Sequence, residues 1–382
     1  MQRIEAHAWF LRRGLPAVLP PGALARGLWP RAAPTLAAFA VFMLNSIAVV
    51  ALTDEHTIDI AGEPTRDEWF ILGLLVLVLP VAAAVGWWVS RLGGLRSRTV
   101  AAAIAVLAAV LGAVFGGPTP RIGIDLVFVG VVVAVILALT ATGVGAILGW
   151  ALDATAQNLA LAGNLFVRAL PVMLLTVLAF FNTYMWLMAS LVSRSRLWLA
   201  LGFLGLIAVA FVTSATVERV RPMLTTTDRP SGDDPGLRGT PFEGLPAPEQ
   251  RVPVTRLERV NVVFVLVVSQ VLQVLTVAIV TGLIFFVLGL ILLNPALLAE
   301  WTRNGSTDGY LLGMTLPVPQ ALIQISMFLG ALTFMYISAR AVGDGDYRAE
   351  FLDPLIRDLR LTLDARDRYR LSDQTPAPPG TS

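Results

Sequence analysis

The sequence predicts an all-α polytopic membrane protein with about eight transmembrane helices, together with interfacial and cytosolic amphipathic helices. Three observations lead to this class. Hydrophobic residues make up 56% of the chain and charged residues only 14%, whereas soluble domains average about 25% charged residues. The charged residues are gathered into short segments that separate long uncharged blocks. Most of these blocks approach or exceed the roughly 20 residues that a helix needs to cross a bilayer.

The uncharged blocks and the segments between them divide the chain into five regions. A basic lead-in covers residues 1–34, of which 1–13 suits either a short interfacial helix or a disordered tail. Six transmembrane helices are then predicted, at 35–52, 69–89, 100–115, 126–152, 171–190 and 197–214. A short interfacial helix is expected over 153–168, before the fifth of them.

The second half of the chain begins with the one long hydrophilic stretch. Residues 216–258 contain seven prolines, so this region is predicted to be a flexible cytosolic loop that cannot bury enough apolar surface to fold alone. Two further transmembrane helices are predicted at 261–293 and 319–342. Residues 343–382 should form a cytosolic amphipathic helix and a disordered tail.

The C-terminal amphipathic helix has a clear starting signal. Asp353 can cap the helix, and Pro354 occupies its first position. Four apolar residues then fall on one face, namely Leu355, Ile356, Leu359 and Leu363. The helix is therefore expected to lie on the cytosolic face of the membrane or under the helix bundle.

The segment 261–293 decides the predicted topology, because it is too long for one upright crossing and too short for two. With one crossing, both termini share a side that holds 23 of the 28 arginines. With two crossings, the division would be 17 against 11. Because arginine-rich loops stay in the cytosol, the sequence favours one crossing with both termini cytosolic. Arg194 and Arg196 violate this pattern locally, and the sequence offers no reason for it.

Two glycine pairs have the four-residue spacing that lets helix backbones approach closely. Gly112 and Gly116 lie near the end of the third predicted span, and Gly145 and Gly149 lie in the fourth. In a chain this rich in alanine and glycine, such spacing often arises by chance.

Several kinds of chemistry are excluded or disfavoured. The chain has no cysteine, which excludes disulfides, thiol catalysis and cysteine-bound metals. No phosphate-binding loop or hydrolase motif occurs. His56 lies among Asp54, Glu55 and Asp59, but a single histidine in an acidic loop usually faces solvent, so no metal site and no cofactor are expected. The net charge of +2 gives no support for nucleic-acid binding.

Uncharged polar residues are the remaining candidates for an intramembrane site. Counted inward along their helices, several fall near the middle of the bilayer and others nearer its outer side. The candidate residues are Asn45, Asn182, Ser269, Gln270, Gln273, Gln320 and Gln324. The simpler interpretation is hydrogen bonding between helices, typically worth about 0.6 kcal/mol per bond. The alternative is a polar-lined cavity for an uncharged or amphipathic substrate.

Part of the chain also resembles an uncharacterised family of actinobacterial multi-pass integral membrane proteins. The resemblance rests on Arg168–Pro171 followed by Phe181–Thr183, on Ser269–Gln270 with Gln273–Leu275, and on Tyr347–Arg348 with Phe351. It extends over residues 160–370. It implies a bacterial plasma-membrane location and no established activity.

The sequence leaves two functions in view, and an enzyme is the less expected class. The first is a non-enzymatic membrane scaffold or accessory component, which contacts lipids and binds a cytosolic or membrane protein through loop 216–258 and the C-terminal helix. The second is a permease or lipid-handling transporter that uses the midplane asparagine and glutamine residues. A shared opening lined by Gln270, Gln273 and Asn182 would favour transport, whereas a tightly packed bundle would favour a scaffold.

Overall fold

The protein is an all-α polytopic helical protein, as the sequence predicts. The computed structural model describes residues 2–20, 22–25, 27–53, 58–60, 64–117, 121–158, 170–225, 235–246, 252–303, 305, 307–311, 314–343 and 353–374. Within these ranges, seven helices are long and apolar enough to cross a membrane. Large apolar side chains point outward from them, for example Leu79, which is 71% exposed. Such surfaces are typical of helices embedded in lipid.

The helices occur in the following order. The first half of the chain contains α1 (Gln2–Arg12), η1 (Pro16–Val18), α2 (Leu28–Thr53), α3 (Arg66–Ser90), α4 (Leu95–Gly116), α5 (Ile122–Ala141) and α6 (Val144–Asn158). The second half contains α8 (Leu170–Phe180), α9 (Thr183–Leu191), α10 (Arg194–Thr225), η3 (Pro235–Leu237), α11 (Arg256–Leu292), α12 (Pro295–Thr302), α13 (Gln320–Gly343) and α15 (Asp353–Gln374).

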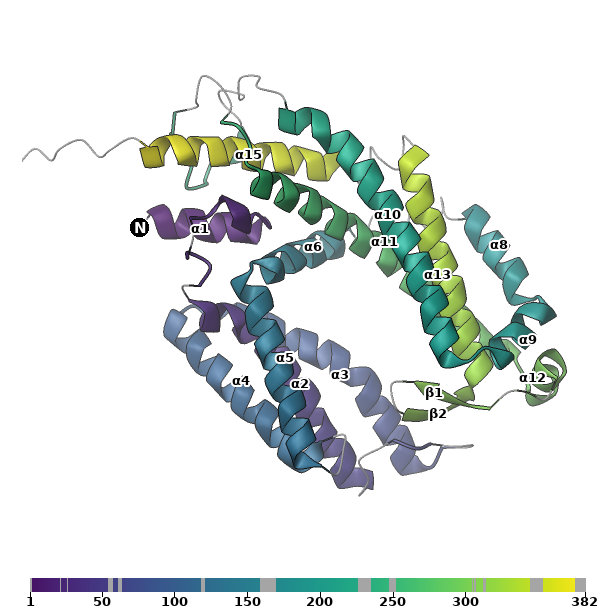
Figure 1. Ribbon diagram of the computed structural model, residues 1–382. Helices are drawn as coiled ribbons and strands as arrows, with labels where there is room; N and C mark the ends of the chain where they lie inside the picture. Colours follow the sequence, from purple (N-terminus) through teal and green to yellow (C-terminus); the bar gives the residue numbers. More distant parts are fainter. Residues whose placement is uncertain are drawn as a thin grey trace, which may run out of the picture.

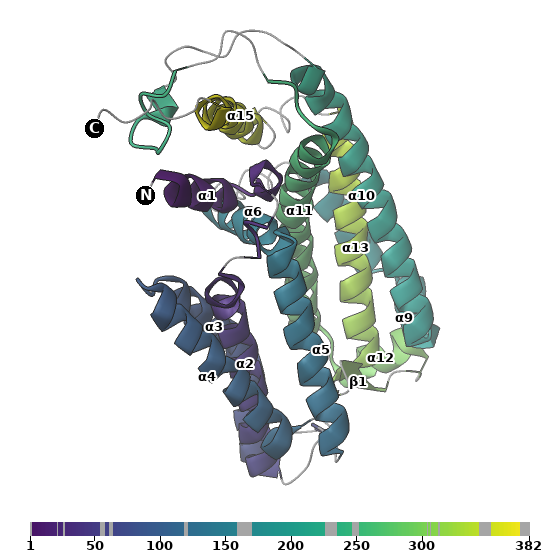
Figure 2. The same ribbon diagram turned by 60° about the vertical axis from the view of Figure 1, so that its left-hand side comes forward.

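The long helices form two groups, which Figures 1 and 2 show side by side. In the first group, α2 packs against α3, α4 and α5. In the second group, α10, α11 and α13 pack against one another, with α8 and α9 along α13. Helix α6 contacts both α5 and α11 and therefore links the groups at one end.

The two ends of the molecule differ in what they carry. Helices α1, α6 and α15 lie at one end, so both ends of the described chain lie on the same side (Figure 1). The opposite end carries α12 and a small hairpin of antiparallel strands, β1 (Asp308–Leu311) and β2 (Met314–Pro319). Residues 58–60 extend this hairpin through two backbone hydrogen bonds to Thr315, of 2.9 and 3.1 Å. The hairpin thus joins the two helix groups at this end.

The prediction of one helix over 126–152 is wrong, because the chain breaks between α5 and α6. Gly143 has a φ of +81°, a left-handed conformation that favours glycine and ends helices. A Cβ atom at Gly143 would lie 2.7 Å from Pro16 Cγ, so the break is also a packing site for the N-terminal segment. Arg31 Nη2 donates at 3.0 Å to the Thr140 carbonyl, which also accepts from the Gly143 N–H at 3.3 Å.

The prediction of one helix over 171–190 is also wrong. Asn182 adopts an extended conformation and caps α9, its side chain accepting from the Tyr184 N–H at 2.9 Å. Trp186 Nε1 donates to the Phe180 carbonyl at 2.6 Å and satisfies the last turn of α8. The chain therefore turns between α8 and α9 instead of continuing. The interfacial helix expected over 153–168 falls partly within α6, and residues 159–169 lie outside the described residues.

The long predicted segment 261–293 lies within α11, a single helix of 37 residues. At 1.5 Å per residue it extends over about 55 Å. A helix without a turn can pass through a bilayer only once. Its start is fixed by a capping box, in which Thr255 and Glu258 satisfy each other's backbone N–H groups.

Candidate functional site

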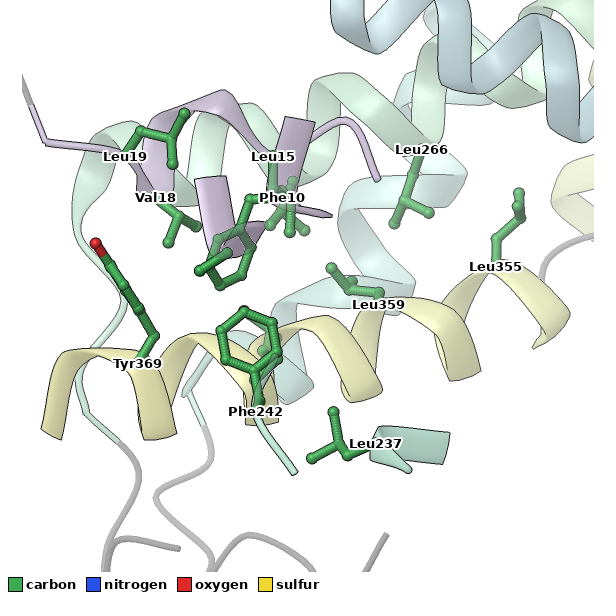
Figure 3. Close-up of a cluster of buried hydrophobic side chains, with 14 of the residues drawn as sticks. Phe10, Leu15, Val18, Leu19, Leu237, Phe242, Leu266, Leu355, Leu359 and Tyr369 are labelled. Carbon is green, nitrogen blue, oxygen red and sulfur yellow. The ribbon is translucent and has the colours of Figure 1, made fainter. Parts of the chain in front are cut away.

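A compact unit of chain segments that are far apart in the sequence surrounds the first turns of α11. We call this unit the end module; it comprises α1, residues 14–20 and 22–24, residues 235–246 and α15. Its apolar core combines Phe10, Phe242, Leu266, Leu359 and Tyr369, all buried, and Figure 3 shows these side chains converging from different elements. The sequence predicts a flexible loop over 216–258, yet Phe242 is 1% exposed and contacts α15.

A buried ion pair fixes α15 to the start of α11. Arg366 Nε and Nη2 donate to the two carboxylate oxygens of Glu258 at 2.9 and 2.7 Å. Both side chains are at most 3% exposed. Arg370 donates to the same carboxylate at 2.7 Å, and Arg366 Nη1 contacts Asp367 at 2.6 Å. This paired, two-point geometry is the strongest form of arginine–carboxylate contact.

The remaining donors of Arg366 are also satisfied. Its Nη1 and Nη2 atoms donate to the carbonyls of Val252 and Pro253 at 2.9 and 3.0 Å. Burial alone would lower the pKa of Arg366, but hydrogen bonding to Glu258 and the charges of Glu258 and Asp367 outweigh it and raise that pKa above its ordinary value. Arg366 therefore stays charged, and its position depends on the carboxylate of Glu258.

The N-terminal segment is attached to the same turns of α11. Asn261 donates to the Gly14 carbonyl and accepts from the Ala17 N–H, both at 3.4 Å. Arg13 forms an ion pair with Asp358 of α15. Helix α11 thus holds α15 through Glu258 and the N-terminal segment through Asn261.

The seven polar residues singled out from the sequence do not form one cluster. Asn45 is half-buried on α2, in the first helix group. Asn182 is exposed and serves as the cap of α9. Neither residue lies with the polar residues of α11, so a common cavity lined by Gln270, Gln273 and Asn182 is not formed.

Gln320 and Gln324 connect α13 to the hairpin and to α9. Gln320 Oε1 accepts from the Tyr310 N–H at 2.7 Å. With its amide nitrogen oriented towards α9, Gln324 donates to the carbonyls of Ala189 and Val192 at 2.6 and 3.2 Å and accepts from Gln320 Nε2 at 2.9 Å. These two residues therefore match the simpler interpretation of hydrogen bonding between helices.

Ser269, Gln270 and Gln273 do lie together on α11. They are 0%, 2% and 4% exposed, respectively. They occupy the face of α11 that also presents Val274 and Ala278 to α10 and α13. Of the seven predicted site residues, these three alone lie together on one face in the middle of a helix.

The structure explains why Arg194 lies at the end of the molecule where few arginines were expected. Arg194 donates to the Tyr310 carbonyl, and its guanidinium lies 4.5 Å from the centre of the Tyr310 ring. It also approaches Gln320 Oε1 at 3.5 Å. Arg194 therefore serves the hairpin as a structural contact.

Replacing Arg194 with alanine should loosen the hairpin by about 1–2 kcal/mol, since it removes a hydrogen bond from a charged group and a cation–π contact at a partly exposed site. Hydrogen exchange of residues 308–311 is the measurement, and their amides should exchange faster. Arg196→Ala is the matched control, because Arg196 is exposed on the same turn of α10. Equal effects of the two substitutions would contradict this role.

Sequence reasoning missed the Glu258–Arg366 pair. The capping-box spacing from Thr255 to Glu258 can be recognised in the sequence, but nothing local to either residue indicates a partner 108 positions away. Among the described residues, no group of three or more acidic or histidine side chains is placed to hold a metal ion. His56 and its neighbours at 54–57 lie outside the described residues.

Comparisons with known proteins give no further assignment. No protein-family model matches the chain, and no match was found among curated proteins or solved structures.

Proposed function

We propose that this membrane protein is a non-enzymatic scaffold or accessory component of a bacterial plasma membrane, with the end module in the cytosol as its partner-binding surface. The single observation that carries the proposal is the buried Glu258–Arg366 pair, which holds α15 as part of a preformed unit. A binding surface that is ordered before its partner arrives avoids the entropic cost of folding on binding.

The exposed residues of the end module suggest what kind of partner it would bind. Arg357 and Arg360 share the outer face of α15, and both are exposed. Arg238, in the segment beside α15, and Arg12 of α1 are exposed as well. The exposed acidic residues Glu5 and Glu243 are fewer than these four arginines, so the surface favours an acidic segment of a protein partner.

Two observations support the orientation. The arginine distribution favours a cytosolic location for both termini, and α1 and α15 lie at the same end of the molecule (Figure 1). Since the chain has no native cysteine, single cysteines can report the orientation directly. In intact cells, a membrane-impermeant maleimide should label Tyr310→Cys and leave Arg360→Cys unlabelled. The reverse pattern would overturn the proposed orientation.

Partner binding can be tested with a photo-crosslinking residue at position 360. We expect a discrete adduct with one protein, reduced by Arg357→Glu on the same face of α15. The matched control places the crosslinker at Tyr310, which is exposed at the opposite end. The scaffold proposal fails if position 360 gives no protein adduct, or if Tyr310 gives the same one.

A permease or lipid-handling transporter is the second candidate, and one observation favours it. The buried polar residues Ser269, Gln270 and Gln273 lie on one helix face within a membrane-spanning segment. A stability screen of the purified protein against lipids and neutral metabolites separates the two functions, because a specific ligand must raise the apparent stability. A clear rise with one compound class, together with no adduct at position 360, would favour transport.

A further inference from the structure

Within the second helix group, buried polar side chains lie between two apolar clusters. On α11, Leu266 belongs to the core of the end module, and Val274 belongs to a separate cluster with α10 and α13. Between them, the buried residues of α11 are Val267, which is 8% exposed, and the polar residues Ser269, Gln270 and Gln273. Over this stretch of about 12 Å, three of the four buried side chains of α11 are therefore polar.

The neighbouring helices also carry buried polar side chains beside these two clusters. On α10, Val220 and Ala208 pack in the same two clusters, and Val212 and Thr216 between them are both fully buried. On α13, Ile337 belongs to the second cluster, and the next residue, Ser338, is fully buried. We call the five residues Thr216, Ser269, Gln270, Gln273 and Ser338 the polar layer.

Most polar atoms of this layer have no partner among the residues that the structure describes. They are Ser269 Oγ, Gln270 Nε2, Ser338 Oγ and both amide atoms of Gln273. Thr216, by contrast, donates to the Val212 carbonyl at 2.7 Å. Buried polar groups in native proteins are nearly always hydrogen-bonded, to protein or to ordered water.

We propose that the polar layer binds a small cluster of water molecules inside the membrane-spanning bundle. The unpartnered atoms include both donors and acceptors, and none of the five side chains is charged. Water is the small neutral molecule that donates and accepts at once, and a buried water makes about three hydrogen bonds. The unpartnered atoms of two carboxamides and two hydroxyls offer several such donors and acceptors.

This proposal is independent of the scaffold function, because it concerns the interior of the bundle. Gln270 lies 14 residues beyond the start of α11, about 21 Å along the helix. The apolar clusters on either side separate the layer from both ends of the bundle. Bound water would therefore be held locally, in contact with α10, α11 and α13.

Radiolytic hydroxyl labelling with mass spectrometry tests the proposal, because radicals formed from ordered water oxidise the side chains beside it. We expect Ile337 and Val274 to be labelled several-fold faster than Leu322, although all three are at most 5% exposed. Leu322 is the control because it lies in another apolar cluster, with Phe285. Labelling of Ile337 and Val274 no faster than that of Leu322 would overturn the proposal.

Gln273→Met gives a second readout, since methionine keeps the length of the side chain and removes both polar atoms. If water bridges Gln273 to the layer, the apparent melting temperature should fall by about 3 °C or more, and labelling of Ile337 should decrease. Thr281→Val is the matched control, because Thr281 is buried on the same helix and its hydroxyl already donates to the Val277 carbonyl at 2.9 Å. A rise in melting temperature with unchanged labelling of Ile337 would show that the layer holds no water and would overturn the proposal. A co-purifying organic molecule that suppresses this labelling would overturn it as well.

Discussion

Replacing Arg366 with alanine should release α15 from the start of α11. The substitution leaves the Glu258 carboxylate buried with Arg370 as its remaining charged partner, and the loss of one member of a buried pair costs about 3 kcal/mol or more. The backbone amides of α15 should then exchange roughly 100-fold faster in hydrogen-exchange mass spectrometry. Exchange in the membrane-spanning part of α13 should be unaffected.

Two further variants show whether charge or packing is responsible. Arg360→Ala lies on the exposed face of the same helix and should leave α15 protected. Glu258→Gln retains a side chain that can complete the capping box, so the start of α11 should stay protected while α15 is released. If the amides of α15 are as well protected from exchange in the Arg366→Ala variant as in the Arg360→Ala variant, the buried pair does not hold the end module together.

Alanine at Gly112 or Gly116 should separate α2 from α4. A Cβ atom at Gly112 would lie 2.6 Å from the Met43 carbonyl oxygen, and one at Gly116 would lie 2.6 Å from Ile47 Cα. Backbone atoms cannot move aside as a flexible side chain can, so each substitution should cost about 1–3 kcal/mol. Ser46 also donates to the Gly116 carbonyl and depends on the same close approach.

The apparent melting temperature of the purified protein measures this cost. Gly130→Ala is the matched control, because Gly130 lies inside α5 with nothing within 4 Å of an added Cβ atom. It should be neutral or slightly stabilising, by up to about 1 kcal/mol, since alanine favours the helix. Equal losses at Gly116 and Gly130 would show that the glycine spacing does not matter for packing.

The two glycine pairs illustrate what the sequence could and could not predict. Both pairs have the same spacing, yet an added Cβ atom would clash with backbone atoms only at Gly112 and Gly116. At Gly145 it would be in ordinary contact with the Leu139 carbonyl oxygen at 3.5 Å, and nothing lies within 4 Å of it at Gly149. Spacing identifies a smooth helix face, but the presence of another helix against it depends on tertiary packing. The long helices were predictable because the length of an apolar stretch is enough to identify a membrane-spanning helix.

The errors in the predicted helices have a local cause. Neither Thr142–Gly143 nor Phe181–Asn182 introduces a charged residue, so the uncharged stretch continues through both breaks. The breaks arise from Gly143 in a left-handed conformation and from Asn182 as a helix cap. The end module could not be predicted from the sequence for a different reason. Its charged residues Asp364, Arg366 and Asp367 are buried, although charge in an amphipathic helix ordinarily indicates exposure.

The end module is built from segments at both ends of the chain, and this fixes the order in which parts of the protein can fold during synthesis. Phe10 and Tyr369 have ring centres 5.7 Å apart, although about 360 residues separate them in the sequence. At the usual 5–20 residues per second, the ribosome needs roughly 20–70 s to make the second after the first. During this time Phe10 and its apolar neighbours on the N-terminal segment lack their final packing partners. The nascent chain must therefore be inserted before its N-terminal segment can fold, which makes this segment a candidate client for chaperones.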